Sequence, residues 1–236
     1  MELILEDVSK NYGQTRALDK FSYVFKCGIY GILGANGAGK STLFNLLTDN
    51  IKRQEGRIML GGRDILDMGR DYRRLIGYMP QQQGFYDKMS AVSYLKYVAY
   101  LKGMKKKASK EQIEKLLELV HLSQYKYKRV GGFSGGMKQR LYIAATLLDD
   151  PDILFLDEPT AGLDPKERVD FRTFLSDLSK DKIILVATHV VSDVENIADE
   201  VIVMKSGHII KSGSPDVLKE DTATASLEEA YMVLTA

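Results

Sequence analysis

The sequence predicts an α/β fold in which buried parallel strands alternate with helices and a helical region is inserted into the chain. Residues 153–156 and 183–187 are continuous apolar runs of strand length, as in parallel strands that are covered on both faces. Residues 90–101 and 109–122 instead carry apolar residues at intervals of three and four, the period of amphipathic helices. Strands that alternate with helices in this way form a sheet sandwiched between helices.

The first third of the chain is predicted to consist mostly of strands. Residues 3–8, 17–26 and 28–33 are rich in β-branched and aromatic residues and are punctuated by glycine. Residues 41–48 have the apolar spacing of a helix that packs on a sheet. We expect residues 56–79 to return to short strands.

Three further helices are expected after the first inserted one. Ser109 is followed three residues later by Gln112, a capping-box pattern that predicts a helix start at Ser109. Residues 165–178 predict a crossover helix between the two apolar strands. The tail from Ser214 is expected to be short and helical.

We therefore expect one domain spanning residues 1–236. Its core would comprise residues 1–82 and 150–236, and its helical subdomain would comprise residues 83–149. No internal repeat or flexible linker divides the chain.

The composition excludes several classes of function. Lys and Arg (33) nearly balance Asp and Glu (32) among the 236 residues, so we expect no nucleic-acid partner. The single Cys27 cannot form an intrachain disulfide, which permits a reducing compartment. No apolar run approaches the roughly 18 residues that span a bilayer, and the N-terminus lacks the pattern of a signal peptide. We expect that the chain does not cross a membrane by itself.

A complete phosphate-binding loop occupies residues 34–41, Gly-Ala-Asn-Gly-Ala-Gly-Lys-Ser. It follows a predicted strand and opens a predicted helix, which is the context that its chemistry requires. Glycines let backbone amides from about Gly37 to Ser41 face the phosphates, and the helix N-terminus favours an anion. Lys40 is expected to reach the β- and γ-phosphates, and the Ser41 hydroxyl to ligate Mg²⁺.

A pair of carboxylates ends the apolar strand 153–156. Asp157 is expected at the carboxyl edge of the parallel sheet, where ligands of α/β folds bind. It would hold Mg²⁺ directly or through water, and the adjacent Glu158 would polarise the attacking water. Positioning and charge neutralisation account for most of the catalysis of phosphoryl transfer.

A second glycine-rich turn, Phe133-Ser134-Gly135-Gly136-Met137, resembles a further phosphate-binding turn. A single triphosphate site needs only one cradle, so the second turn suggests a site that another copy of the protein completes. The alternative interpretation is an ordinary helix N-cap at Ser134.

Together, residues 34–42, 133–137 and 156–159 resemble the nucleotide-binding subunit of ATP-binding cassette (ABC) transporters, in the family's order and across nearly the whole chain. The resemblance implies a P-loop NTPase core with an N-terminal antiparallel β subdomain and an inserted α-helical subdomain. It also implies ATP and Mg²⁺ as cofactors. The residues that it assigns to the phosphates are Asn36, Gly37, Ala38, Gly39, Lys40, Ser41, Thr42, Ser134, Gly135 and Gly136.

The resemblance assigns roles to four further residues. Tyr12 matches the aromatic residue that stacks on adenine, and His189 matches the histidine that contacts the γ-phosphate. Gln81 matches the glutamine that senses Mg²⁺ and water, although its neighbours Gln82 and Gln83 leave the register open. Asp164 matches the loop that crosses to the opposite subunit.

The signature turn departs from the family's Leu-Ser-Gly-Gly-Gln at both ends. Phe133 retains an apolar anchor, so we expect it to be harmless. Met137 lacks a side-chain amide that could bond the sugar, so we expect a working site with altered ATP affinity.

The resemblance further implies partners and a location. Two nucleotide-binding subunits, as a homodimer or heterodimer, would sandwich two ATP molecules and move separate transmembrane permease subunits from the cytoplasmic face of the membrane. The tail 226–231 and residues 135–138 resemble the exporter branch, which favours export over uptake. Two alternatives stay open here: a soluble ABC-type ATPase acting on ribosomes or DNA, and an ATP-dependent switch that does not hydrolyse.

Overall fold

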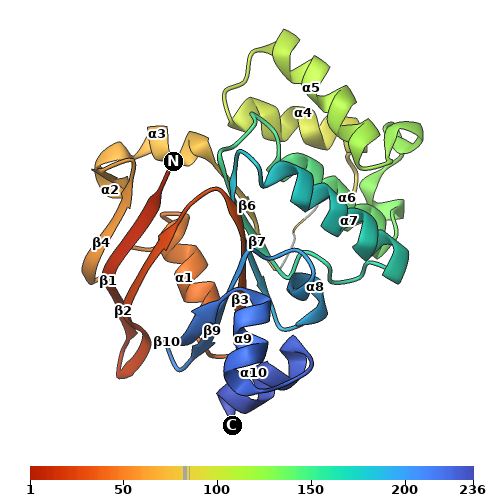
Figure 1. The fold of residues 1–236 in the computed structure, drawn as a ribbon. Helices are drawn as coiled ribbons and strands as arrows, with labels where there is room; N and C mark the ends of the chain where they lie inside the picture. Colours follow the sequence, from red (N-terminus) through yellow and green to blue (C-terminus); the bar gives the residue numbers. More distant parts are fainter. Residues whose placement is uncertain (82–83, 85) are drawn as a thin grey trace.

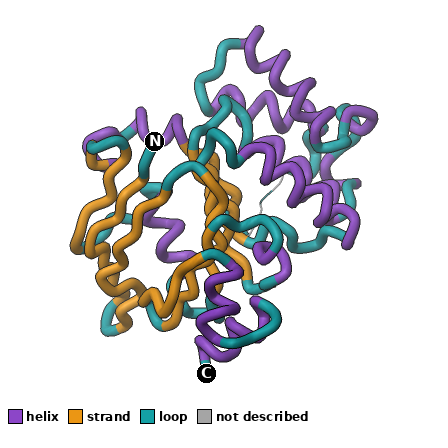
Figure 2. Tube along the Cα trace, viewed as in Figure 1, coloured by secondary structure: helices purple, strands orange, loops and turns teal. Residues whose placement is uncertain are grey.

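Two β-sheets and a group of helices make up the computed structural model of the chain (Figure 1). The structure describes residues 1–81, 84 and 86–236. The alternative glutamines Gln82 and Gln83 lie outside the described residues. In Figure 2 the strands gather in one half of the molecule and most helices in the other.

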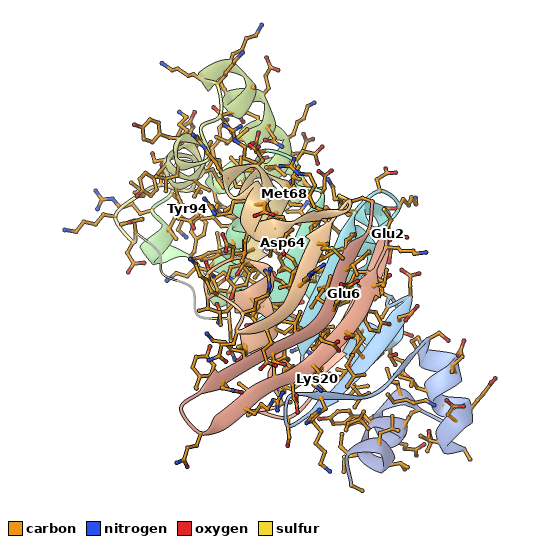
Figure 3. All side chains as sticks on the ribbon, turned by 90° about the vertical axis from the view of Figure 1, so that its left-hand side faces the viewer. Glu2, Glu6, Lys20, Asp64, Met68 and Tyr94 are labelled. Carbon is orange, nitrogen blue, oxygen red and sulfur yellow. The ribbon has the colours of Figure 1, made fainter. Side chains whose placement is uncertain are left out.

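The smaller sheet is antiparallel and has the strand order β2-β1-β4-β5. Figure 3 views it from outside, with exposed Glu2, Glu6 and Lys20 labelled along it. The inward positions of β1, Leu3, Leu5 and Val8, are buried, which is the alternation expected of a sheet with one wet face. Its strands are β1 (Leu3–Tyr12), β2 (Thr15–Phe25), β4 (Glu55–Leu60) and β5 (Arg63–Asp64).

The larger sheet has the order β10-β9-β3-β8-β7-β6 and is parallel except for β10. Its parallel arrangement places the carboxyl ends of β3, β6, β7 and β8 at one edge. Its strands are β3 (Gly28–Leu33), β6 (Ile76–Met79), β7 (Ile153–Asp157), β8 (Ile183–Thr188), β9 (Glu200–Lys205) and β10 (His208–Gly213).

Helices cover the larger sheet and form a separate lobe beside it, the lobe of α4, α5 and α6 (Figure 1). Among the described residues, no helix is both long and apolar enough to span a bilayer. The helices are α1 (Lys40–Leu47), α2 (Ile65–Met68), α3 (Arg70–Leu75), α4 (Ala91–Leu101), α5 (Lys106–Leu119), α6 (Gly135–Thr146), α7 (Pro165–Leu178), α8 (Ser192–Glu195), α9 (Pro215–Thr222) and α10 (Leu227–Thr235).

The larger sheet separates two hydrophobic cores. Alternate side chains of each strand enter opposite cores: Ile29 and Leu33 pack towards the helical lobe, whereas Tyr30 and Ile32 pack towards α1 and the antiparallel sheet. Strands buried on both faces in this way must be apolar at every position. This requirement explains the continuous apolar runs of β7 and β8.

The structure corrects the prediction that residues 56–79 form only short strands. Residues 65–75 form α2 and α3 instead. Asp64 caps α2 by accepting a hydrogen bond from the Leu66 amide at 3.0 Å. Gly69, with φ 53°, separates the two short helices.

The capping-box prediction at Ser109 and Gln112 is also wrong. Helix α5 begins earlier, at Lys106, and the Ser109 hydroxyl donates to the Lys106 carbonyl at 3.0 Å. The Gln112 side-chain oxygen accepts from the Asp149 amide at 2.9 Å, beyond the end of α6. Gln112, which the pattern assigned to a helix cap, therefore contacts the segment after α6 instead.

Candidate nucleotide-binding site

The loop between β3 and α1 forms one wall of a cavity of about 450 Å³ at the carboxyl edge of the larger sheet. Glycine is required at Gly39, because φ is 107° and an added Cβ would lie 2.5 Å from the Ala17 carbonyl oxygen. The cavity is lined by Thr15, Arg16, Ala17, Ala35, Asn36, Gly37, Ala38, Gly39, Lys40, Ser41, Thr42, Gln81, Asp157, Glu158 and Ser206.

Lys40 brings a buried positive charge to this cavity. Its side chain is folded against the loop, where the ammonium donates to the carbonyls of Gly34 and, at 3.2 Å, Ala35. Burial lowers the pKa of Lys40, and the nearby carboxylates of Glu158 and Asp157 oppose that shift. A polyanion in the cavity would neutralise this partly desolvated charge.

Asp157 brings a buried acid to the same cavity from the end of β7. Burial is the main cause that raises the pKa of Asp157 to about 6; the charge of Glu158 adds to the shift, and Lys40 opposes it. A carboxyl group that is destabilised as an anion in the free protein gains from a cation placed beside it.

Glu158 leaves the strand in a left-handed backbone conformation, with φ 50°. Its carboxylate is fixed on the end of β8: Oε1 lies 2.7 Å from His189 Nδ1 and accepts from the His189 amide at 3.1 Å. Oε2 accepts from the Thr188 hydroxyl at 3.1 Å. The carboxylate that the sequence assigns to water activation is therefore held at the cavity wall, in contact with the predicted γ-phosphate histidine.

The residues present fit a nucleotide phosphate with Mg²⁺. Among the described residues, no group of three His, Cys, Asp or Glu side chains could hold a metal ion. Mg²⁺ favours one or two carboxylates supplemented by substrate phosphates and water. Ser41 and Asp157 both line the cavity that would hold those phosphates, and Gln81 lines it as well.

Three groups of predicted site residues lie outside this cavity lining. Tyr12, which is 49% exposed at the end of β1, pairs across the hairpin with Thr15, a lining residue. His189 reaches the cavity through Glu158. The third group comprises the signature turn, of which Ser134 and Gly135 are exposed, and Asp164, which is also exposed.

The signature turn is the start of α6. Ser134 caps this helix by accepting from the Met137 amide at 3.2 Å. Phe133 is buried and anchors the turn in the core, and Met137 packs partly buried against the same core. Among the described residues that line the nucleotide cavity, none belongs to this turn.

Asp164 is the N-cap of α7. Its carboxylate accepts from the Glu167 amide at 2.8 Å, and the Glu167 carboxylate accepts from the Asp164 amide at 3.2 Å. This capping box explains locally why an aspartate precedes Pro165. The role in a partner contact stays a prediction.

Sequence reasoning missed the lining residues Thr15, Arg16, Ala17 and Ser206. It also missed buried contacts of the segment that follows β7. Gln139 of α6 is buried and donates to the backbone carbonyls of Glu158, at 3.4 Å, and Pro159. Thr160 donates to buried Asp193 of α8. In the sequence, Gln139 is an amide side chain among the apolar residues of a predicted helix. This signal indicates a polar contact but does not identify the partner.

Comparisons with known proteins agree with this geometry. A model described as ABC transporter matches residues 19–161. The chain is 39% identical to the uncharacterised ABC transporter ATP-binding protein YxlF of Bacillus subtilis, over 94% of this chain and 74% of that protein. It is 34% identical to the Nod factor export ATP-binding protein I of Burkholderia orbicola, over 95% and 75%. A solved structure described as the ATP binding subunit of an ABC transporter aligns over 100% of both chains, with a TM-score of 0.90 and 26% identity.

Proposed function

Because this chain belongs to the ABC transporter family, we propose that it hydrolyses ATP and that the hydrolysis drives transport across a membrane. One observation supports this most strongly. The glycine loop with Lys40 and the adjacent carboxylates Asp157 and Glu158 are distant in the sequence and line a single cavity.

The proposed chemistry is phosphoryl transfer to water. Lys40 and the loop amides bind the phosphates and stabilise charge that develops on them. Mg²⁺, when bound, would neutralise phosphate charge, and Ser41 and Asp157 would hold it. Glu158 accepts a hydrogen bond from the attacking water and orients it.

His189 positions the carboxylate for this step. Its ring and its backbone amide both meet Oε1 of Glu158, so the carboxylate cannot turn away from the cavity without losing two contacts. Positioning of this kind lowers the barrier because the catalytic group is already oriented when substrate arrives.

We further propose that two subunits close on ATP. Ser134, Gly135 and Asp164 are exposed on their own chain, and the N-terminus of a helix favours an anion. In the closed pair, Ser134, Gly135 and Gly136 would contact the nucleotide held by the partner's glycine loop.

Transmembrane permease subunits are the proposed targets of this motion, reached from the cytoplasmic face of the membrane. Export is the proposed direction, supported by the relative named for Nod factor export. The relatives described above are named as transporter components, which gives no support to an ATPase acting on ribosomes or DNA.

Replacement of Lys40 by Ala tests the phosphate cradle. We expect Lys40→Ala to weaken ATP binding by about tenfold or more, because a buried charge that faces the phosphates is lost. Isothermal titration calorimetry measures the affinity, with Lys52→Ala, an exposed lysine of the β subdomain, as the control. An unchanged affinity in Lys40→Ala would contradict the cradle.

Replacement of Glu158 by Gln tests hydrolysis separately from binding. Glutamine keeps the shape of the side chain and one oxygen that can accept from the His189 amide or from Thr188. It cannot accept a proton, so we expect turnover to fall by about 10²–10⁴-fold. ATP binding should persist and an ATP-bound dimer should accumulate on a sizing column. Exposed Glu228→Gln is the matched control, and wild-type turnover in Glu158→Gln would remove Glu158 from this role.

A further inference from the structure

A second, basic cavity lies at the opposite edge of the larger sheet from the nucleotide cavity. Its volume is about 350 Å³. Helix α3 leads into the amino end of β6, and Asp149 precedes β7, whereas the nucleotide cavity lies at the carboxyl ends. The two cavities share no lining residue. The basic cavity is lined by Arg70, Arg73, Arg74, Leu101, Lys102 and Asp149.

Positive charge in this cavity is only partly compensated. Arg73 forms an ion pair with Asp49 at 2.7 Å. Among the described residues, neither Arg70 nor Arg74 forms an ion pair. Asp149 is the one acidic residue among the described residues that line the cavity. The cavity therefore presents a net positive charge.

Lys102 places a further cation at the cavity wall. It is half-buried, and its ammonium donates to the Leu148 carbonyl at 2.6 Å, just beyond α6. Burial lowers the pKa of Lys102, and Asp149 only partly offsets the effect. A neutral carbonyl does not compensate the charge of a partly desolvated ammonium, so an anion beside it would be favourable.

Favourable interaction with the dipole of α3 explains the positions of only some of the arginines in this cavity. Arg73 and Arg74 lie in the last turn of α3, where a cation interacts favourably with the helix dipole. Arg70 is the first residue of the same helix, where a cation is unfavourable. Its guanidinium instead reaches the turn after α4: an added Cβ at Gly103 would lie 3.7 Å from Arg70 Nη2.

The geometry points to a binding site for a phosphate-bearing anion in this cavity, held by Arg70 and Arg74 from α3 and by Lys102 from the turn after α4. Guanidinium groups bind phosphate oxygens through two parallel hydrogen bonds, and an ammonium adds a point charge. The site joins the sheet core to the helical lobe, which lie side by side at this end of the molecule (Figure 1). A bound anion would contact both.

Exposed apolar side chains beside the cavity indicate a lipid headgroup as one source of the phosphate. Tyr100 and Leu101 are 79% and 63% exposed at the end of α4. A basic site with an adjacent aromatic and aliphatic residue suits the headgroup region of an anionic bilayer. Free phosphate or pyrophosphate is the other source of the same chemistry.

The test compares two double variants, each lacking two positive charges. Both are made in full-length protein carrying Lys40→Ala, which weakens phosphate binding at the glycine loop. The cavity variant is Arg70→Ala with Arg74→Ala. The control is Lys52→Ala with Arg57→Ala, both exposed and outside every ion pair of the described residues.

Two measurements distinguish the sources of the phosphate. Flotation with vesicles of phosphatidylcholine, with or without phosphatidylglycerol, measures lipid binding. Calorimetry with inorganic pyrophosphate measures the affinity for a free anion.

We expect the cavity variant to lose about tenfold or more in affinity for one or both probes, while the control keeps the parental affinity. Loss for anionic vesicles alone identifies a lipid phosphate, and loss for pyrophosphate identifies a site for free anion. Equal binding by the cavity and control variants for both probes would overturn the proposal. Unchanged melting temperatures check the fold, and Arg74→Gln alone is the second variant if the double variant is unstable.

Discussion

At the scale of single residues, burial opposes both charges that the nucleotide cavity needs. Lys40 and Asp157 are each nearly excluded from solvent, and burial shifts the pKa of each towards its neutral form. Shifts of this kind gather at functional sites, where a ligand supplies the missing opposite charge. The free protein is therefore destabilised at the position where the nucleotide and its metal ion would bind.

Replacement of Asp157 by Asn should stabilise the nucleotide-free protein near neutral pH. The pKa of Asp157 is about 6 in the folded protein and 3.8 in the reference state, so the folded state binds the proton more tightly. The associated stability is fully present below about pH 4 and is lost as pH rises through about 6. At pH 7.5 the ionised group costs up to roughly 3 kcal/mol, which the neutral amide avoids.

Thermal unfolding of both proteins at pH 5 and pH 7.5 measures this effect. The melting temperature of Asp157→Asn should exceed that of the parent at pH 7.5, and the difference should shrink at pH 5. A difference independent of pH would rule out ionisation of Asp157 as the cause.

Local motifs could be predicted from the sequence, whereas contacts across the fold could not. The glycine loop encodes its own backbone shape, so its place beside Lys40 follows from eight consecutive residues. The contact of Glu158 with His189 spans 31 positions, and its geometry depends on the pairing of β7 with β8. Gln139 likewise carries no local sign that its partners are the carbonyls after β7.

At the scale of elements, burial on both faces decided which predictions succeeded. Strands β7 and β8 lie between two cores, so residues 153–156 and 183–187 are all apolar. Short runs of this kind predict buried parallel strands. Residues 65–75 form short helices at the surface, where few apolar positions reveal a period. Helix α5 starts at Lys106, and neither residue of the capping pattern caps it: Ser109 donates to the Lys106 carbonyl within the helix, and Gln112 contacts the segment after α6. Other side-chain hydrogen bonds thus replace the capping pattern.

Replacement of Gly77 by Ala tests how closely β6 packs against the end of α6. An added Cβ would lie 2.6 Å from the Thr146 carbonyl oxygen and 2.8 Å from Leu154 Cδ2. We expect a loss of about 1–3 kcal/mol, because backbone cannot move aside as easily as a flexible side chain. Chemical denaturation measures the free energy of unfolding.

Gly135→Ala is the matched control for Gly77→Ala. Nothing lies within 4 Å of its added Cβ, and alanine is favoured over glycine at the start of α6. Equal stability of the two variants would show that β6 can move away from α6.

At the scale of the whole molecule, the predicted ABC ATPase fold is confirmed by the aligned subunit structure. The proposed composite site would use two separate surfaces of this fold. The cavity surface is complete in a single chain, whereas the signature turn lies on a different surface of that chain. The glycine-rich turn predicts that a second copy takes part, but the geometry of the contact cannot be predicted from one chain, because the contact belongs to neither copy alone.

Replacement of Ser134 by Arg should prevent the closed pair while leaving the single-chain cavity intact. A long cation at the start of α6 would occupy the space of the partner's nucleotide and oppose the helix dipole. Sizing chromatography with ATP in the Glu158→Gln background measures the dimer. ATP affinity of the monomer should change by less than about threefold.

Ser214→Arg controls for the loss of a helix cap, because Ser214 also caps a helix by accepting a backbone amide at 3.3 Å. Both variants lose about 1 kcal/mol of capping stability. A normal ATP-bound dimer in Ser134→Arg would refute the composite site.

The left-handed backbone at Glu158 lowers the stability of the folded protein, although the proposed hydrolysis needs a carboxylate at this position. Glycine or asparagine would relieve about 1–2 kcal/mol of local strain there, yet either would remove the carboxylate from the cavity. Either replacement would also lose the contacts of the Glu158 carboxylate with Thr188 and His189, so the net gain in stability would be smaller than the strain alone. A variant selected at this position for heat resistance would keep the glycine loop but lack the carboxylate proposed to orient water.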